Sequence, residues 1–153
     1  MTYNEFNTFC RALPATTYVM QWGGSHVWKV GGKVFAIGGW EDKPPAFIFK
    51  TTDLTFEILA DQPGLRPAPY FASRGLKWIQ HYATPGLSNA ELRDYLRQSH
   101  AIVASGLTKR QRVELGLAPL GIEISKVQMP KRGSHKATSR RNARPTLKRQ
   151  KAR

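Results

Sequence analysis

A few side chains of this chain could perform acid-base, metal or nucleophilic chemistry, and their spacing argues against all three. The four histidines show no H-x-x-x-H or H-E-x-x-H spacing, so a metal site would need a cluster that the sequence does not signal. Cys10 is the only cysteine and can neither close an intrachain disulfide nor build a zinc site alone. Ser25 and His26 are adjacent in a predicted strand, where neighbouring side chains point to opposite faces and cannot act as nucleophile and base. The sequence therefore predicts a non-enzymatic protein without a cofactor or metal.

Three Gly-Gly pairs could indicate phosphate-binding loops. They lie at residues 23–24, 31–32 and 38–39, but none belongs to a G-x-G-x-x-G or G-x-x-x-x-G-K-[ST] motif. The pairs are typical of turns between strands, because glycine adopts positive φ at little cost.

Charge supplies the strongest functional signal. The chain has 153 residues, 24 Lys and Arg against 10 Asp and Glu, and a formal charge of +14. Residues 126–153 hold 11 of the basic residues and no acid. With few large apolar residues, this tail is predicted to be disordered and to attract nucleic acid, its candidate contacts including Lys131, Arg132, Arg140 and Arg141. The alternative is a tail that serves only for solubility or for RNA tethering.

Length and hydropathy limit the remaining classes of protein. One domain is expected over residues 1–117, followed by a linker over 118–125 and the tail over 126–153. The longest apolar stretch is only a few residues, and the N-terminus lacks a basic region followed by a signal-cleavage site. The sequence predicts a cytoplasmic protein without membrane insertion.

Two capping boxes predict the main helices that must position the basic residues. Thr2 with Glu5 predicts a helix from about Tyr3 to Leu13, stopped by Pro14. The same spacing at residues 88 and 91 predicts the longest helix, over about 89–105. A shorter helix, capped by Thr52, is expected to bury a stripe that contains Leu54, Ile58 and Leu59.

The clearest local pattern is a hairpin. Alternating runs at 26–30 and 33–37 flank the glycine pair 31–32, which suits a two-residue turn. In that register Val30 faces Lys33, Lys29 faces Val34 and Trp28 faces Phe35, and the two aromatic residues enter the core. Lys29 then points to the opposite face and Lys33 lies at the tip. A wing that contacts DNA phosphates and an ordinary solvated hairpin are both consistent with this pattern.

Further basic residues mark the second half of the domain. Residues 63–70 predict a proline-set loop or extended segment, and residues 76–82 predict a strand introduced by Arg74 and Lys77. Residues 93, 97 and 100 give the long helix a basic flank. Gly106 ends that helix, and Thr108 can cap a second one that carries Lys109, Arg110 and Arg112. This pattern resembles a helix-turn-helix, and a plain helical hairpin is the alternative.

The aromatic residues suggest a second function. Trp28 and Trp78 alternate as core residues, whereas Trp22 and Trp40 lie beside glycines and are available to stack on a base or ligand. A pocket formed by Trp22, Trp40, Tyr70, Lys50 and Arg66 would make the protein a small-molecule or protein-interaction module.

Several short strings, taken in order, resemble the MmcQ/YjbR family over about residues 1–117. They are Trp28-Lys29-Val30-Gly31-Gly32-Lys33-Val34-Phe35-Ala36, Phe49-Lys50, Gly64-Leu65-Arg66-Pro67 and Lys77-Trp78. The resemblance implies an α+β domain with an antiparallel sheet and flanking helices, of the CyaY-like double-wing type, and DNA binding. The basic tail lies outside the family pattern. Kinship to frataxin-like proteins also raises iron binding, but residues 1–15 hold a single acid, Glu5, and hard cations need clustered carboxylates.

The sequence thus predicts a DNA-binding protein. Lys29, Lys33, Arg74 and Lys77 would contact phosphates, Trp40 would stack or wedge, and the tail would add sequence-independent affinity.

Overall fold

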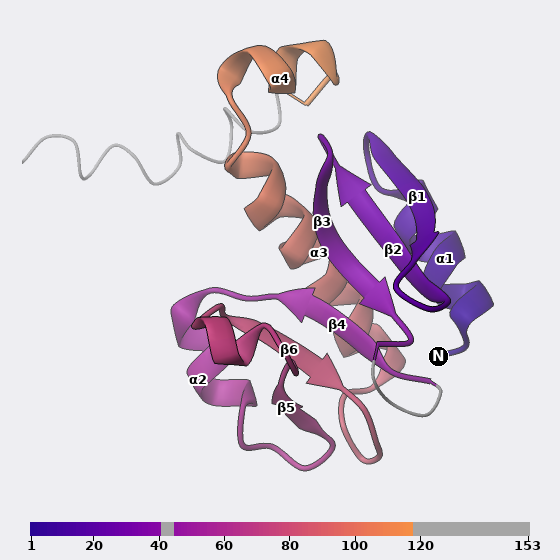
Figure 1. Ribbon diagram of the computed structural model, residues 1–153, viewed down its shortest axis with the longest axis vertical. Helices are drawn as coiled ribbons and strands as arrows, with labels where there is room; N and C mark the ends of the chain where they lie inside the picture. The colour runs from indigo at the N-terminus through magenta and orange to yellow at the C-terminus, as the bar shows by residue number, and fades with distance from the viewer. Residues whose placement is uncertain (41–44, 118–153) are drawn as a thin grey trace, which may run out of the picture. The chain divides into compact units, whose positions relative to one another are not determined.

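The computed structural model describes residues 1–40 and 45–117, which form an α+β domain with a six-stranded antiparallel sheet (Figure 1). The elements in chain order are α1 (Tyr3–Ala12), β1 (Thr16–Gln21), β2 (Ser25–Val30), β3 (Lys33–Gly38), β4 (Phe47–Lys50), α2 (Asp53–Leu59), β5 (Leu65–Pro67), the 3-10 turn η1 (Ala72–Arg74), β6 (Trp78–His81), α3 (Asn89–Ser105) and α4 (Lys109–Glu114). The predicted fold class is confirmed for the domain. The predicted linker, 118–125, and tail, 126–153, lie outside the described residues.

Both capping boxes form and fix the starts of α1 and α3. The Thr2 hydroxyl accepts a hydrogen bond from the Glu5 amide at 3.1 Å, and the Glu5 carboxylate accepts one from the Thr2 amide at 2.9 Å. Ser88 and Glu91 make the same reciprocal pair at the start of α3. Helix α1 ends at Ala12, and α3 has the predicted bounds.

The sheet has the strand order β1-β2-β3-β4-β6-β5, and every neighbouring pair is antiparallel. One face, here called the helical face, packs its apolar side chains against the three longer helices, through Phe6 of α1, Leu59 of α2 and Leu92 of α3. Helix α3 crosses behind the sheet in Figure 1, whereas η1 lies in front of it. The front side is called the second face.

The second face carries a smaller core. Val27, Ile37 and Ile48 line up across β2, β3 and β4, where paired residues of adjacent strands lie side by side. Trp78 joins them from β6, and its ring stacks on Phe71 with centroids 5.0 Å apart. Because strand side chains alternate, residues two positions along a strand from these core residues lie on the same face.

The hairpin register is correct near the turn and wrong one pair further along. Val30 pairs with Lys33 and Lys29 with Val34 as predicted, but Trp28 pairs with Ala36 instead of Phe35. A β-bulge inserts Phe35 as an extra residue, so both Phe35 and Ala36 are buried in the helical-face core. The prediction that Trp28 and Phe35 enter one core is confirmed.

Two other predictions need correction. Leu54 and Ile58 are 70% and 54% exposed, so α2 buries only Leu59 of the predicted stripe; the helix has seven residues and presents one edge to the sheet. The proline-rich passage, predicted as a loop or extended segment, contains the strand β5, and β6 covers Trp78–His81 rather than 76–82.

Candidate nucleic-acid interface

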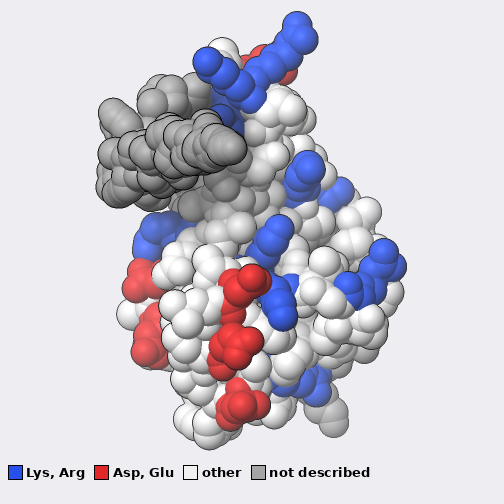
Figure 2. Space-filling model, turned by 90° about the vertical axis from the view of Figure 1, so that its left-hand side faces the viewer, with Lys and Arg blue, Asp and Glu red and all other residues white. Residues whose placement is uncertain are grey.

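The acidic side chains of the described residues are confined to the helices and their edges, whereas basic side chains lie on both helices and strands. All described acids lie on a helix or, in one case, just after α2: Glu5, Asp53, Glu57, Asp61, Glu91, Asp94 and Glu114. Below α4 in Figure 2, these acids gather in the left and centre of the view, while the right-hand side shows only Lys and Arg. The acids Glu41 and Asp42 lie outside the described residues. Within the described part, every charged side chain on the strands and on η1 is therefore basic.

Strand alternation places three basic residues on the second face. Lys29 lies two residues after Val27, and Lys50 two residues after Ile48, so each shares the face of that core residue. Arg66 pairs with Gln80, which shares the face of Trp78. Lys29 points away from the helical core as predicted. Lys50 lies in register with Trp78, whose ring stacks on Phe71 just before η1.

The hairpin tip and α4 meet at one end of the domain. A Cβ added to Gly31 would lie 2.6 Å from the Leu107 side chain, so the turn packs directly against the residue that precedes α4. Lys33 at the tip and Lys109 and Arg110 in the first turn of α4 are exposed. These three residues, called the basic end, come from two separate predicted motifs that the structure unites.

Arg74 and Lys77, also predicted to contact phosphates, are exposed, and each contacts an aromatic ring of the domain. Arg74 donates a hydrogen bond to the Tyr70 hydroxyl at 3.0 Å, and its guanidinium lies 5.5 Å from that ring. The Lys77 ammonium lies 4.8 Å from the centre of the Phe56 ring. Arg74 belongs to η1 and Lys77 precedes β6, so neither is part of a hairpin wing.

The second helix of the predicted helix-turn-helix is short. Helix α4 has only six residues, and Arg112 donates from its guanidinium to the carbonyls of Leu107 at 2.6 Å and Ser105 at 3.4 Å. Arg112 thus stabilises the end of α3 rather than pointing to solvent as an exposed groove-reading residue would. Arg110 lies 3.7 Å from Glu114, a separation at which an exposed ion pair contributes little.

The predicted basic flank of α3 is only partly formed. His100 is buried, its Nε2–H donates to the Pro14 carbonyl at 2.8 Å, and its ring meets Phe35 edge to face. Arg97 pairs with Asp94 at 2.7 Å. The flank prediction is wrong for His100, because this side of α3 faces β3 and the end of α1.

Burial of His100 gives the fold a pH dependence. Desolvation lowers the pKa of His100, and the hydrogen bond to Pro14 opposes that shift only in part. The unfolded chain then binds more protons than the folded one as the pH falls below about 6.5, so stability declines toward acid. We expect His100→Asn to be less stable at neutral pH but to lose less further stability between about pH 7 and pH 5, as measured by urea unfolding. An unchanged slope against pH would contradict this role.

Five aromatic residues from separate segments gather on the second face. This aromatic cluster consists of Trp22, Trp40, Tyr70, Phe71 and Trp78. The Trp22 ring meets Trp40 edge to face at 5.3 Å, and the Trp40 centroid lies 6.4 Å from Tyr70 and 6.1 Å from Phe71. The structure therefore brings together three of the aromatic residues that the sequence proposed for a pocket.

A buried glutamine, which the sequence analysis missed, fixes the centre of the cluster. Gln80 is fully buried, donates to the Trp40 carbonyl at 2.6 Å and accepts from Arg66 Nε at 2.7 Å. The Arg66 guanidinium also lies 4.4 Å from the Tyr82 ring, so Arg66 packs between Gln80 and Tyr82 instead of lining an open pocket. Only its alternation in β6, opposite Lys77, Ile79 and His81, could have signalled the position of Gln80.

Neither Cys10 nor the adjacent Ser25 and His26 is arranged for nucleophilic chemistry. Cys10 is buried in the helical-face core, and burial raises the pKa of its thiol far above the ordinary value. Ser25 and His26 pair with residues on alternate positions of β1 and take opposite faces of the sheet. Among residues 1–40 and 45–117, no group of three or more His, Cys, Asp or Glu is placed to hold a metal ion.

Other features of the described part lie away from the basic surfaces. A groove of about 370 Å³ runs between α1 and α3, lined by Asn4, Glu5, Thr8, Phe9 and Arg93.

No helix within the described ranges has the length and apolar character needed to cross a membrane. The predicted tail contacts Lys131, Arg132, Arg140 and Arg141 lie outside the described residues.

Comparison with known proteins gives one family and one fold. A crystal structure of the Deinococcus radiodurans protein DR2400, described as a DUF419 domain, superposes with a TM-score of 0.65 at 24% identity, covering 76% of this chain and 88% of that one. That likeness shows a shared fold. No curated protein matches the chain. The YjbR family model matches residues 11–102, which run from the end of α1 into the second half of α3 and span more than half of the chain, and the chain therefore belongs to the YjbR family.

Proposed function

We propose that this protein binds DNA without catalysing a reaction, through phosphate contacts at the basic end and along the second face. The observation that carries the proposal is that the described acids lie only on or beside helices, while the hairpin and η1 carry Lys and Arg without an acid and the start of α4 exposes two more basic residues. Oriented positive side chains of this kind attract the DNA backbone, largely through release of its counterions.

The geometry favours a rigid contact at the basic end. Lys33 directly follows the two-residue turn Gly31-Gly32, and the turn packs on Leu107, two residues before Lys109. A rigid scaffold loses little entropy when it meets a phosphate row, so a few charges here can position the domain. Lys29, Arg74 and Lys77 supply further positive charge on and beside the sheet.

The tail is proposed to add affinity for DNA because it is part of the same chain as the domain. Leu117, the last described residue, is buried in the core at the α4 end, and its amide donates to the Arg112 carbonyl at 2.7 Å. The chain therefore leaves the described part from the same end that carries Lys33 and Lys109. When one part of a molecule holds DNA, a tethered basic segment meets the same DNA at a high effective concentration.

The basic end predicts a defined change in salt dependence. In the full-length protein, the double substitution K33Q/K109Q is expected to reduce the slope of log affinity against log salt by about 1.8, since each phosphate contact contributes about 0.9 on duplex DNA. Fluorescence anisotropy with a labelled duplex across a salt series measures the slope. Both side chains are exposed, so the fold should be unaffected.

The matched control removes the same charge elsewhere. Arg93 and Arg97 are exposed on α3 beside Asp94, so R93Q/R97Q should leave the slope nearly unchanged. If both doubles lowered the slope equally, binding would depend on net charge alone and not on the basic end.

A second candidate function rests on the aromatic cluster. Trp22 and Tyr70 expose half of their surface and Arg74 contacts Tyr70, an arrangement suited to a small anionic ligand with a ring, with the tail then serving only for solubility or RNA tethering. A thermal-shift screen of nucleotides and anionic metabolites tests this function, because a ligand that binds the folded state raises the melting temperature. No shift with any compound would exclude the classes screened.

A further inference from the structure

Two exposed aromatic residues of the cluster have an unusual backbone conformation. Trp22 has φ +50° and Tyr70 has φ +75°, in the left-handed region that bulky L residues rarely adopt. Such conformations persist only where the surrounding structure imposes them, and they are concentrated at functional sites. Glycine would adopt either backbone without this cost.

Neither ring is used to fill the core. Trp22 and Tyr70 are 50% and 54% exposed, and both lie against Trp40 in edge or tilted orientations. Trp40 is itself held by its indole N–H, which donates to the Pro69 carbonyl at 3.3 Å, and by the buried Gln80 side chain that donates to its own carbonyl. A fixed central ring thus supports two outer rings with much of their surface open to solvent.

Positive charge lies beside one of the outer rings and on the same face. Arg74 donates a hydrogen bond to the Tyr70 hydroxyl and its guanidinium lies 5.5 Å from that ring, while Lys50 lies in register with Trp78 of the cluster. Exposed aromatic faces next to Lys and Arg are the combination with which proteins bind single strands, since bases stack on the rings while cations meet the phosphates. In a duplex the base faces are already stacked and unavailable.

We propose that the aromatic cluster is a stacking site for unpaired bases, with Trp22 and Tyr70 as the platforms, so that the protein prefers single-stranded segments of nucleic acid. This inference rests on the proposed function for its phosphate contacts. It adds a contact that counterion release alone does not supply, because an electrostatic tail binds a strand with or without bases.

The test compares two single strands of equal charge. Full-length protein is titrated at one low salt concentration with an oligothymidylate of about 12 nucleotides and with an abasic strand of the same length. We expect the thymidylate to bind at least about fivefold tighter, the lower end of the range for stacking of one base. Trp22→Gly should remove this preference and leave the affinity for the abasic strand unchanged.

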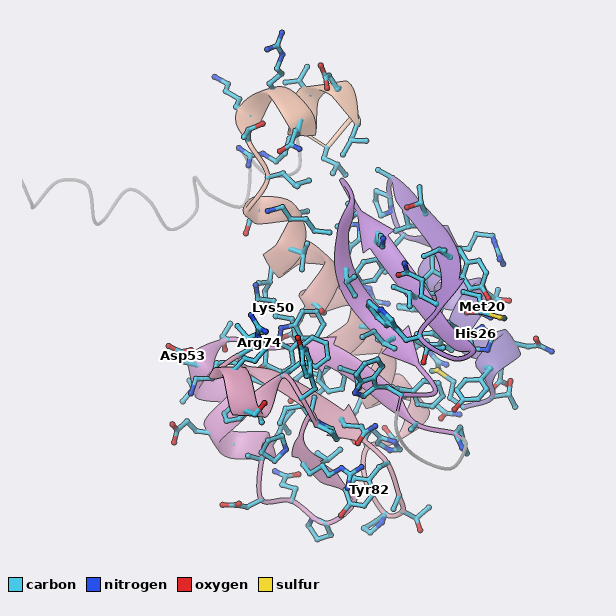
Figure 3. All side chains as sticks on the ribbon, viewed as in Figure 1. Met20, His26, Lys50, Asp53, Arg74 and Tyr82 are labelled. Atoms are coloured by element: carbon cyan, nitrogen blue, oxygen red, sulfur yellow. The ribbon has the colours of Figure 1, made fainter. Side chains whose placement is uncertain are left out.

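Two controls separate stacking from folding. Met20 of β1 lies two residues before Trp22 and is 57% exposed, but it pairs with His26 on the other side of the sheet, away from Lys50 and Arg74 in Figure 3, so Met20→Ala should keep the preference. Because glycine relieves the positive φ, Trp22→Gly should melt no lower than Trp22→Ala, and a cooperative transition of Trp22→Gly shows that its fold survives. Tyr70→Gly is the second test variant.

The outcomes distinguish the inference from the proposed function. Equal, measurable binding of both strands would overturn stacking and leave phosphate binding intact, whereas binding of neither strand would overturn both. A preference that persists in both Trp22→Gly and Tyr70→Gly would place stacking elsewhere. Thymidine monophosphate that binds as tightly as the oligomer would assign the cluster to a small ligand and overturn the inference.

Discussion

Removing residues 126–153 is expected to flatten the salt dependence of DNA binding more than any other change to this chain. The segment holds 11 Lys and Arg and no acid, so full engagement with duplex phosphates would contribute about 10 to the log-log slope. If only six of these residues meet phosphates, the full-length protein still loses about 10³-fold in affinity between 50 and 200 mM salt. The truncated chain should lose far less over the same range, as measured by anisotropy titrations.

A charge substitution checks that the effect is electrostatic and not a consequence of shortening the chain. Neutralising Lys131, Arg132, Arg140 and Arg141 to Gln in the full-length protein should lower the slope by about 3.6 if all four contact duplex phosphates. A slope that is insensitive to both changes would mean that the tail does not touch the DNA.

Replacing Gly64 by Ala is expected to destabilise the domain by about 3 kcal/mol or more. Gly64 has φ +85°, where an L residue costs about 1–2 kcal/mol, and a Cβ there would overlap the Ala83 carbonyl oxygen and lie 2.6 Å from the Gly86 amide nitrogen. Both contacts are with backbone that is fixed by hydrogen bonds to residues 63 and 64, so relief by rotamer change is unavailable. Overpacking of this kind typically adds a further 1–3 kcal/mol.

Gly75 offers a matched control for that substitution. Its φ is +75°, but nothing lies within 4 Å of a Cβ placed there, so Gly75→Ala should cost only the conformational part, about 1–2 kcal/mol. Urea unfolding of both variants gives the difference. Equal destabilisation would show that the segment after β6 does not pack on Gly64, and hence that the start of β5 is not anchored as described.

Local patterns predicted much of this fold because their physics is local. Thr2 and Ser88 each satisfy helix amide groups within three residues, and the glycine pair 31–32 fixes the hairpin turn through its own backbone freedom. The bulge at Phe35 was missed, because two apolar residues in succession do not reveal which of them is unpaired. The exposure of Leu54 and Ile58 depends on how little of α2 reaches the sheet, which periodicity cannot show.

The candidate site depended on contacts between distant segments. Trp22, Trp40 and Tyr70 were singled out by their type and neighbours, but the hydrogen bond from buried Gln80 that holds the central Trp40 arises only when β6 pairs beside β4. The basic end forms because Gly31 packs against Leu107, a contact across more than seventy residues that no motif records. His100 was assigned to a basic flank because helical spacing alone cannot tell a buried face from an exposed one.

The central claim is that the folded domain, and not only its tail, binds DNA. Equilibrium binding of residues 1–125 to a labelled duplex, measured from the lowest practical salt upward, tests this claim most directly. Our account predicts measurable binding with a salt slope that falls by about 1.8 in K33Q/K109Q. Absence of binding by residues 1–125 at low salt, in a sample that unfolds cooperatively, would contradict it.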